Sequence, residues 1–168
     1  MSVEIREATA DDVAAIRDVA RDSWYAAYGG FLDPSTVEGA LGEYYDPELI
    51  EAGVEHDDIA FFVAVDGEGG EESVLGFASA EQTWADEVEL HTIYVHPDRW
   101  GEGVGAALLD RIRRWATEQG VDRIACSVLA ENSVGIGFFE ASGFRRGAEA
   151  KGEIAGELHD EYEFELEL

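Results

Sequence analysis

Three glycines at alternate positions restrict what this chain can build between a strand and a helix. Gly101, Gly103 and Gly105 follow a β-branched apolar segment, 87–95, and lead into an amphipathic helix expected over 103–119. Without Cβ atoms, the backbone can approach a ligand closely and adopt left-handed dihedral angles. The free N–H groups of the first helical turn then converge on one place, aided by the helix dipole. The segment therefore predicts a cradle for a phosphate group.

Two known phosphate-binding motifs compete for this loop. A P-loop needs Gly-Lys-Ser/Thr, which the sequence lacks. The segment from Gly101 to Ala106 does fit the dinucleotide fingerprint G-x-G-x-x-A, with Glu131 where a ribose-binding acid is expected. Against this, residues 96–100 separate the strand from the glycines, and too few residues follow to complete a second nucleotide-binding half. A nicotinamide-dependent oxidoreductase remains an alternative.

The hydrophobic pattern predicts an α+β fold in a single domain, 1–168. Strands are expected at 3–6, 59–65, 74–80, 87–95, 123–129, from 144, and at 158–168; helices from about 11 to 28, 35 to 52 with a break near Asp46-Pro47, 103 to 119 and 133 to 141, with a turn at 66–70. The unit from 87 to 129 suits a strand–helix–strand crossover, which joins parallel strands. We expect a mixed, mostly antiparallel sheet with helices on both faces and a central parallel β-α-β unit.

The charge balance excludes several classes of partner. There are 38 acidic against 11 basic residues, for a net charge of −27 at pH 7, and Lys151 is the only lysine. Such a field repels nucleic acid and anionic membranes. Because the acids are spread along the whole chain, we interpret them as adaptation to a halophile's salty interior, in preference to steering of cationic substrates.

Other sequence features point to the cytoplasm. No apolar run reaches the roughly 18 residues of a membrane span, and residues 1–10 lack the apolar core of a signal peptide. Cys126 is the only cysteine, so a cysteine-based metal cluster is not expected. Cys126 alternates with Ile124 and Val128, which predicts a buried core residue and not an acyl-carrying nucleophile.

Three motifs together resemble the GNAT superfamily of acyl-CoA N-acyltransferases. The family signature Gln/Arg-x-x-Gly-x-Gly/Ala is similar to Trp100–Gly105, with tryptophan in place of Gln or Arg. A second motif, Asn-x5-Phe-Tyr-x3-Gly-Phe, is similar to Asn132–Phe144, with Phe139 where many relatives carry tyrosine. The strand at 89–97 and the aromatic helix around Trp24 extend the resemblance over nearly the whole chain.

The resemblance implies an N-acetyltransferase of the acyl-CoA N-acyltransferase fold that uses acetyl-CoA and no metal. The strands at 89–95 and 123–129 would part, and the pantetheine arm would lie between them. Coenzyme A binding is thereby assigned to Ile93, Tyr94, Val95, Trp100, Gly101, Glu102, Gly103, Val104, Gly105, Ala106, Asn132, Phe138 and Phe139. The acceptor would be a small-molecule amine or a protein N-terminus, and the strand at 161–168 could pair two subunits as a homodimer.

Direct attack of an amine on the thioester in a ternary complex is the expected mechanism. Because the amine is mostly protonated at neutral pH, a base is useful. Glu89 matches the place of some relatives' catalytic glutamate, although a solvated edge carboxylate would look the same. His91, two residues on and on the same side, is the second candidate.

Phe139 leaves the general acid open, because a phenyl ring has no proton to give to the leaving thiolate. Tyr94 and Ser142 are candidate substitutes that the sequence does not rank. The same residue keeps a third alternative in view, a non-catalytic acyl-CoA sensor.

Overall fold

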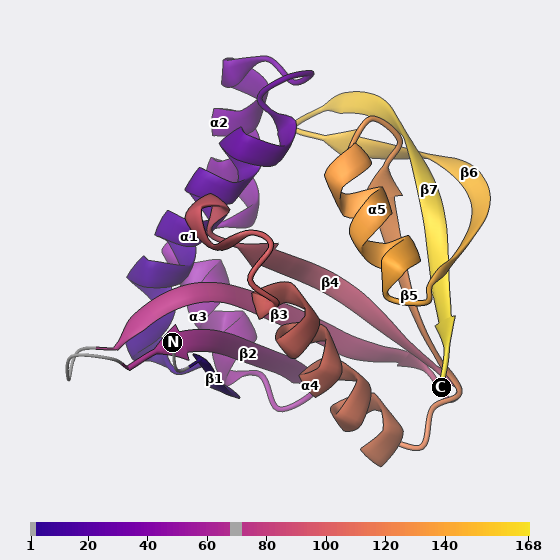
Figure 1. Ribbon diagram of the computed structural model, residues 1–168. Helices are drawn as coiled ribbons and strands as arrows, with labels where there is room; N and C mark the ends of the chain where they lie inside the picture. Colours follow the sequence, from indigo (N-terminus) through magenta and orange to yellow (C-terminus); the bar gives the residue numbers. More distant parts are fainter. Residues whose placement is uncertain (1–2, 68–71) are drawn as a thin grey trace.

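The computed structural model describes residues 3–67 and 72–168 (Figure 1). One seven-stranded sheet has the order β1-β2-β3-β4-β5-β7-β6. Its strands are β1 (Val3–Glu7), β2 (Ile59–Asp66), β3 (Ser73–Trp84), β4 (Glu87–Val95), β5 (Arg123–Leu129), β6 (Arg145–Ile154) and β7 (Glu157–Glu167). β4 and β5 pair in parallel, and the other neighbours pair antiparallel. The expected mixed sheet with a central parallel unit is therefore confirmed.

Five helices of the described chain accompany the sheet: α1 (Val13–Tyr28), α2 (Pro34–Tyr44), α3 (Pro47–Glu55), α4 (Val104–Glu118) and α5 (Ser133–Ala141). The break expected near Asp46-Pro47 is confirmed, because Asp46 caps a new helix by accepting a hydrogen bond from the Glu48 backbone N–H at 2.9 Å. None of these helices is both long and apolar enough to cross a membrane. The turn expected at 66–70 lies largely outside the described residues.

The sheet separates two hydrophobic cores, as the prediction of helices on both faces required. On one face, α4 packs against β2 to β5 and buries Phe62, Leu108, Ile112, Ile124 and Phe164. On the other face, α1 to α3 bury Ile16, Trp24, Val37, Val63 and Phe77. Figure 1 shows the N-terminal helices and α4 on either side of the strands. The strands between them are consequently covered on both faces.

The first strand is tied to the start of α1 by an ion pair around Asp12. The Arg6 guanidinium donates from Nη1 and Nη2 to the two Asp12 oxygens, each at 2.8 Å. The Thr9 backbone N–H donates to the same carboxylate at 2.8 Å. Asp12 is only 6% exposed. Hydrogen bonds from Arg6 hold the pKa of the Asp12 carboxyl below its usual value.

We predict that Asp12→Asn lowers the free energy of unfolding by about 1–3 kcal/mol, because the partly buried Arg6 guanidinium loses its paired bonds to Asp12 and keeps only its second carboxylate partner, Glu72. The pKa of Asp12 is depressed in the folded state, so its contribution is complete above its unfolded value of about 3.9 and fades as pH falls through the folded value. Urea unfolding at about pH 7 and about pH 3 should therefore show a smaller difference in acid. Asp11→Asn, at an exposed neighbour, is the control. An equal loss at both pH values would contradict the ion-pair origin.

Candidate active site

A β-bulge in β4 sets which way its side chains point. Consecutive residues of β3 pair with Leu90 and with Thr92, so His91 is an extra residue between them. An extra residue shifts the alternation of side chains along the strand. Leu90 and Ile93 consequently both reach the core beneath α4, although they are three positions apart. Tyr94 instead packs into the core beneath α1.

β4 and β5 separate just before this bulge. Their parallel register runs from Glu87 opposite Arg123 to Glu89 opposite Ala125, and no later pair occurs among the described residues. β5 itself continues, paired with β7, as far as Leu129. The C-terminal half of β4 therefore presents an open edge towards β5. The parting of these strands, implied by the resemblance, is present in the fold.

The peptide groups of Ile93 and Val95 point to this open edge. The His96 N–H donates to the Leu75 carbonyl of β3 at 2.8 Å. Because peptide groups alternate in direction along a strand, Tyr94 turns its N–H and C=O to β3, and its two neighbours turn theirs away. The Val95 carbonyl accepts a hydrogen bond from the Trp100 indole Nε1–H at 2.8 Å. This edge can pair with an extended ligand as it would with a strand.

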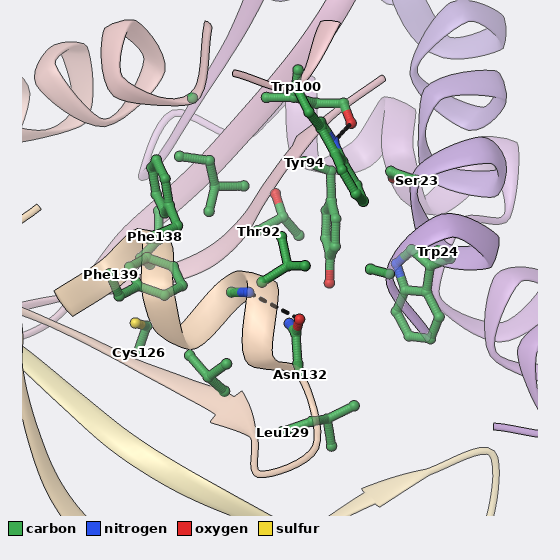
Figure 2. A pocket seen from close by; sticks show the side chains of 18 of the residues that line it. Ser23, Trp24, Thr92, Tyr94, Trp100, Cys126, Leu129, Asn132, Phe138 and Phe139 are labelled. Carbon is green, nitrogen blue, oxygen red and sulfur yellow. Dashed lines mark hydrogen bonds between the residues drawn. The ribbon is translucent and has the colours of Figure 1, made fainter. Parts of the chain in front are cut away.

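The open edge borders a pocket of about 530 Å³ that extends from α4 and α5 to α1 (Figure 2). Of the residues singled out from the sequence, those that line it are His91, Ile93, Tyr94, Val95, Trp100, Gly101, Gly103, Val104, Gly105, Ala106, Cys126, Asn132, Phe138 and Phe139. Glu89 and Glu102 are not among the lining residues. The Glu102 carboxylate instead forms an ion pair with Arg99, with 3.4 Å between Oε2 and Nε.

The pocket also has one wall that sequence reasoning missed, the β6–β7 hairpin with Ile154 and Glu161. Thr92 and Leu129 line the pocket too, on the two strands expected to form the cleft, but the sequence did not assign them individually. Alternating strand patterns do not say which strands meet around a cavity, so no local signal marks these positions. Trp24 of α1 is buried and lines the pocket as well.

The three glycines of the loop have different structural roles. Gly101 and Gly103 adopt left-handed φ angles of 80° and 85°, and nothing lies within 4 Å of where their Cβ atoms would stand. Gly103 is the N-cap of α4. A Cβ on Gly105 would meet the Phe138 ring at 3.0 Å, so this glycine lets α5 pack closely on α4. The first turn of α4 thus offers its free N–H groups to the pocket, the arrangement that binds phosphate.

Asn132 combines a cap with a place in the pocket wall. Its side-chain oxygen accepts a hydrogen bond from the Gly135 N–H at 2.9 Å, which caps α5. A Cβ on Gly135 would collide with the Asn132 amide, so this cap requires glycine at position 135. The cap fixes where α5 begins and hence where Phe138 and Phe139 stand. Figure 2 shows these rings and Asn132 along one wall.

The two candidate bases lie side by side on the face of β4 that is turned towards α1. His91 Nδ1 lies 3.9 Å from the Glu89 carboxylate, and His91 Nε2 lies 3.2 Å from the Glu81 carboxylate of β3. The imidazole lines the pocket, whereas the Glu89 side chain is 52% exposed beside it. His91 therefore stands between Glu89 and the pocket, held between two carboxylates.

A buried pair of tyrosines lies at the α1 end of the pocket. The Tyr94 and Tyr28 hydroxyls are 3.0 Å apart and share a hydrogen bond. Burial raises the pKa of both phenols, so both stay protonated at neutral pH. Ser142 is not among the pocket's lining residues; its hydroxyl donates to the Phe138 carbonyl at 2.8 Å. Of the two substitutes for Phe139 considered from the sequence, Tyr94 is the one whose side chain reaches the pocket.

Cys126 sits on β5 in the core beneath α4, as its alternation with apolar neighbours predicts. Burial, with a smaller effect of the Glu89 charge, raises the pKa of this thiol to about 12. No group of three or more His, Cys, Asp or Glu side chains within residues 3–67 and 72–168 is arranged to hold a metal ion. The polar groups at the site are main-chain donors, two tyrosines, an imidazole and carboxylates.

Comparisons with known proteins agree with this geometry. The sequence model of the acetyltransferase (GNAT) family matches residues 14–144. A spermidine N(1)-acetyltransferase of Thermoplasma acidophilum is 26% identical over 86% of this chain and 89% of its own length. An uncharacterized N-acetyltransferase of Bacillus subtilis is 30% identical over 92% of this chain and 87% of its own length.

Solved structures share the fold. The PaiA N-acetyltransferase of Thermoplasma acidophilum, solved in complex with coenzyme A, matches 100% of both chains with a TM-score of 0.88 and 24% identity. A GCN5-related N-acetyltransferase from Rhodopseudomonas palustris matches 100% of this chain and 97% of its own, with a TM-score of 0.81 and 20% identity. The mixed sheet described above is thus the fold of these proteins.

We predict that the acyl-transfer rate of Cys126→Ala stays within about twofold of the wild-type rate. With a pKa of about 12, on the order of one thiol in ten thousand is the reactive thiolate at pH 8, so Cys126 is a poor nucleophile. Iodoacetamide should label the folded wild-type protein slowly and the urea-unfolded protein at the rate of a free thiol. Rapid labelling of the folded protein, or loss of transfer in the alanine variant at an unchanged melting temperature, would contradict this interpretation.

Proposed function

The chain belongs to the acetyltransferase (GNAT) family of acyl-CoA-dependent N-acetyltransferases, and from this membership we propose that it acetylates a primary amine by direct attack on acetyl-CoA in a ternary complex. The observation that carries the proposal is the pocket that joins the open edge of β4 to the glycine-rich start of α4. Its one end suits a pantetheine arm with its pyrophosphate, and its other end, beneath α1, is left for an acceptor.

The coenzyme would be held mainly by backbone groups. The pyrophosphate would rest on the N–H groups between Gly103 and Ala106, where the dipole of α4 favours negative charge. The pantetheine amides would pair with the strand edge at Ile93 and Val95. Phe138 and Phe139 would cover the arm from the side of α5.

The chemical step requires a series of proton and charge movements. A base takes a proton from the ammonium, and the neutral amine nitrogen forms a bond to the thioester carbon. The C–S bond then breaks, the released thiolate takes up a proton, and the new amide nitrogen returns its second proton to the group that protonated the sulfur. We assign the base to Glu89, acting through His91 or a water molecule, with His91 itself as the runner-up. A backbone N–H of the strand from Ile93 to Val95 would face the developing oxyanion.

Tyr94 would provide a proton for the leaving thiolate. Its hydroxyl lines the pocket, and its pKa is raised by burial, so it is protonated at neutral pH. The bond to Tyr28 can orient it. A thiolate with a pKa of about 8.5 leaves readily, so the demand on this acid is modest.

For the acceptor, we propose a cationic amine of the polyamine class. The carboxylates of Glu81 and Glu89 flank His91, and Glu161 lines the pocket near Ile154. Positively charged groups beyond the reacting nitrogen would meet the Glu161 carboxylate in the pocket wall and the other two carboxylates beside His91. The resemblance to a spermidine N(1)-acetyltransferase supports the same class.

The nicotinamide alternative finds no support in the fold. A dinucleotide-binding sheet needs several parallel strands in β-α-β succession. The described chain has one parallel pair, β4 with β5, next to an antiparallel meander. Membership of an acetyltransferase family likewise argues against a non-catalytic sensor.

We predict that thiol release from acetyl-CoA depends on an added amine, with spermidine or spermine faster than an amino acid or a peptide with a free N-terminus. Acetyl-CoA should also raise the melting temperature, and NAD should leave it unchanged, because only the ligand that binds the native state stabilises it. Thiol release that no amine accelerates would refute the transferase proposal. A preference for the peptide would refute the polyamine assignment alone.

We predict that Glu89→Gln lowers kcat/KM by about 10²-fold near neutral pH and removes the acidic limb of the pH–rate profile, because an amide cannot accept the amine's proton. Glu163→Gln, an exposed glutamate on β7, is the matched control and should keep the wild-type profile. If Glu89→Gln leaves the profile unchanged and His91→Gln removes the limb, the base is His91. If neither changes it, both assignments fail.

A further inference from the structure

Trp100 lies across the open edge of β4, where a bound pantetheine arm would have to run. It follows the short 3-10 helix Pro97–Arg99, and its side chain folds back over the end of the strand. The indole Nε1–H donates to the Val95 carbonyl at 2.8 Å. The ring lines the pocket and is 39% exposed, and Figure 2 shows it standing beside Tyr94.

The position of the indole nitrogen is that of a strand partner. A chain paired with β4 would place an amide nitrogen about 2.9 Å from the Val95 carbonyl oxygen, on the side turned to β5. Trp100 Nε1 is already on that side at that distance. A pantetheine amide and the indole cannot both stand there, because each fills the same strip along the strand.

The backbone on either side of Trp100 permits the side chain to move without the turn. Arg99 anchors the preceding helix through an ion pair with Asp66 at 3.3 Å. Gly101, directly after the tryptophan, has a φ of 80° and open space around it. The indole itself makes one hydrogen bond to the strand and leaves a large part of its surface in solvent. Rotation about its side-chain bonds is therefore the least costly way to clear the strand edge.

We propose that Trp100 is a removable cover of the pantetheine track: its indole must leave the Val95 carbonyl before coenzyme A can pair with β4. This inference rests on the proposed function, since it concerns how that co-substrate enters the pocket. The cover satisfies a carbonyl that would otherwise lack a strand partner. Breaking the indole–carbonyl hydrogen bond also weakens the binding of coenzyme A, whereas the nucleotide half alone binds without breaking it.

The two halves of coenzyme A should respond differently to the indole. The pantetheine arm competes with the indole, while the pyrophosphate and adenosine bind at the start of α4, beyond the covered carbonyl. A substitution that removes the indole N–H and keeps an aromatic ring should favour the whole coenzyme. The same substitution should leave a ligand that lacks the arm unaffected.

The test is titration calorimetry of the full chain with coenzyme A and with 3′-phosphoadenosine 5′-diphosphate, its nucleotide half. Trp100→Phe should lower the Kd of coenzyme A by about 3- to 10-fold, the net worth of one hydrogen bond that no longer has to break. The Kd of the nucleotide should stay the same. Trp84→Phe, at an exposed tryptophan on β3 outside the pocket, is the matched control and should change neither value.

Each other outcome has a defined meaning. An unchanged or higher Kd of coenzyme A in Trp100→Phe, at an unchanged melting temperature, overturns the cover. Equal changes for both ligands overturn it too, because they would place the effect in the glycine loop. If the wild-type protein binds neither the nucleotide nor coenzyme A, the cover and the proposed function are both overturned.

A second measurement uses the wild-type protein and so does not depend on how the variant folds. Hydrogen exchange at the Trp100 indole N–H, assigned by NMR from the resonance missing in Trp100→Phe, should accelerate when coenzyme A is added. It should stay slow with the nucleotide alone. Slow exchange with both ligands would show that the indole keeps its bond to Val95 and would overturn the proposal.

Discussion

The site depends on a strand edge that the sheet leaves unpaired in its own interior. β4 loses β5 after Glu89, so the peptide groups of Ile93 and Val95 face a cleft and not a neighbouring strand. Buried main-chain groups need hydrogen-bond partners, and leaving them unpaired lowers the stability of a fold unless a ligand, a side chain or water takes the place of the strand. The bulge at His91 adds a second consequence, because it turns Tyr94 towards α1 while Ile93 and Val95 keep to the side of α4. The parting of the two strands thus defines the track for a ligand, and the bulge sets which residues lie beside its reactive end.

Much of this architecture could be predicted from residue patterns, and the reason is that it is encoded locally. A glycine run before an amphipathic helix predicts the start of α4, and the distance from 87 to 129 predicts a parallel crossover. The bulge could not be predicted in this way. Glu89, Leu90 and His91 alternate as in any regular strand, and only the register with β3 shows that His91 is extra. Register is a property of two strands together and leaves no mark in the sequence of one.

Contacts between distant segments escaped the sequence for the same reason. The tip of the β6–β7 hairpin rests on α2, where the Thr36 hydroxyl donates to the Glu157 carboxylate at 2.7 Å and Ala155 lies against Gly39. This contact brings Ile154 and Glu161 to the pocket. Nothing in the alternating pattern of the last strand distinguishes Glu161 from the solvated glutamates around it, and Ile154 ends the preceding strand with no local sign that it reaches a cavity. The sequence predicts the last strand, but the packing of the β6–β7 hairpin on α2 determines which of its residues face the site.

The strong negative charge of the chain explains why backbone N–H groups, and not lysines, would bind the phosphates of coenzyme A. Coenzyme A carries several phosphate charges, and a protein with a net charge of −27 repels them at long range. Arg99, which precedes the loop and lines the pocket, is already engaged by the carboxylates of Asp66 and Glu102. Helix N–H groups act over the first turn only and carry no net charge, so they bind a phosphate without altering the field of the whole surface. A salt-rich medium with a Debye length of only a few ångströms would screen the repulsion and spare these short-range bonds. A phosphate site built from main chain is therefore the kind that an acidic surface can keep, whereas one built from lysines would need charges that this sequence has almost eliminated.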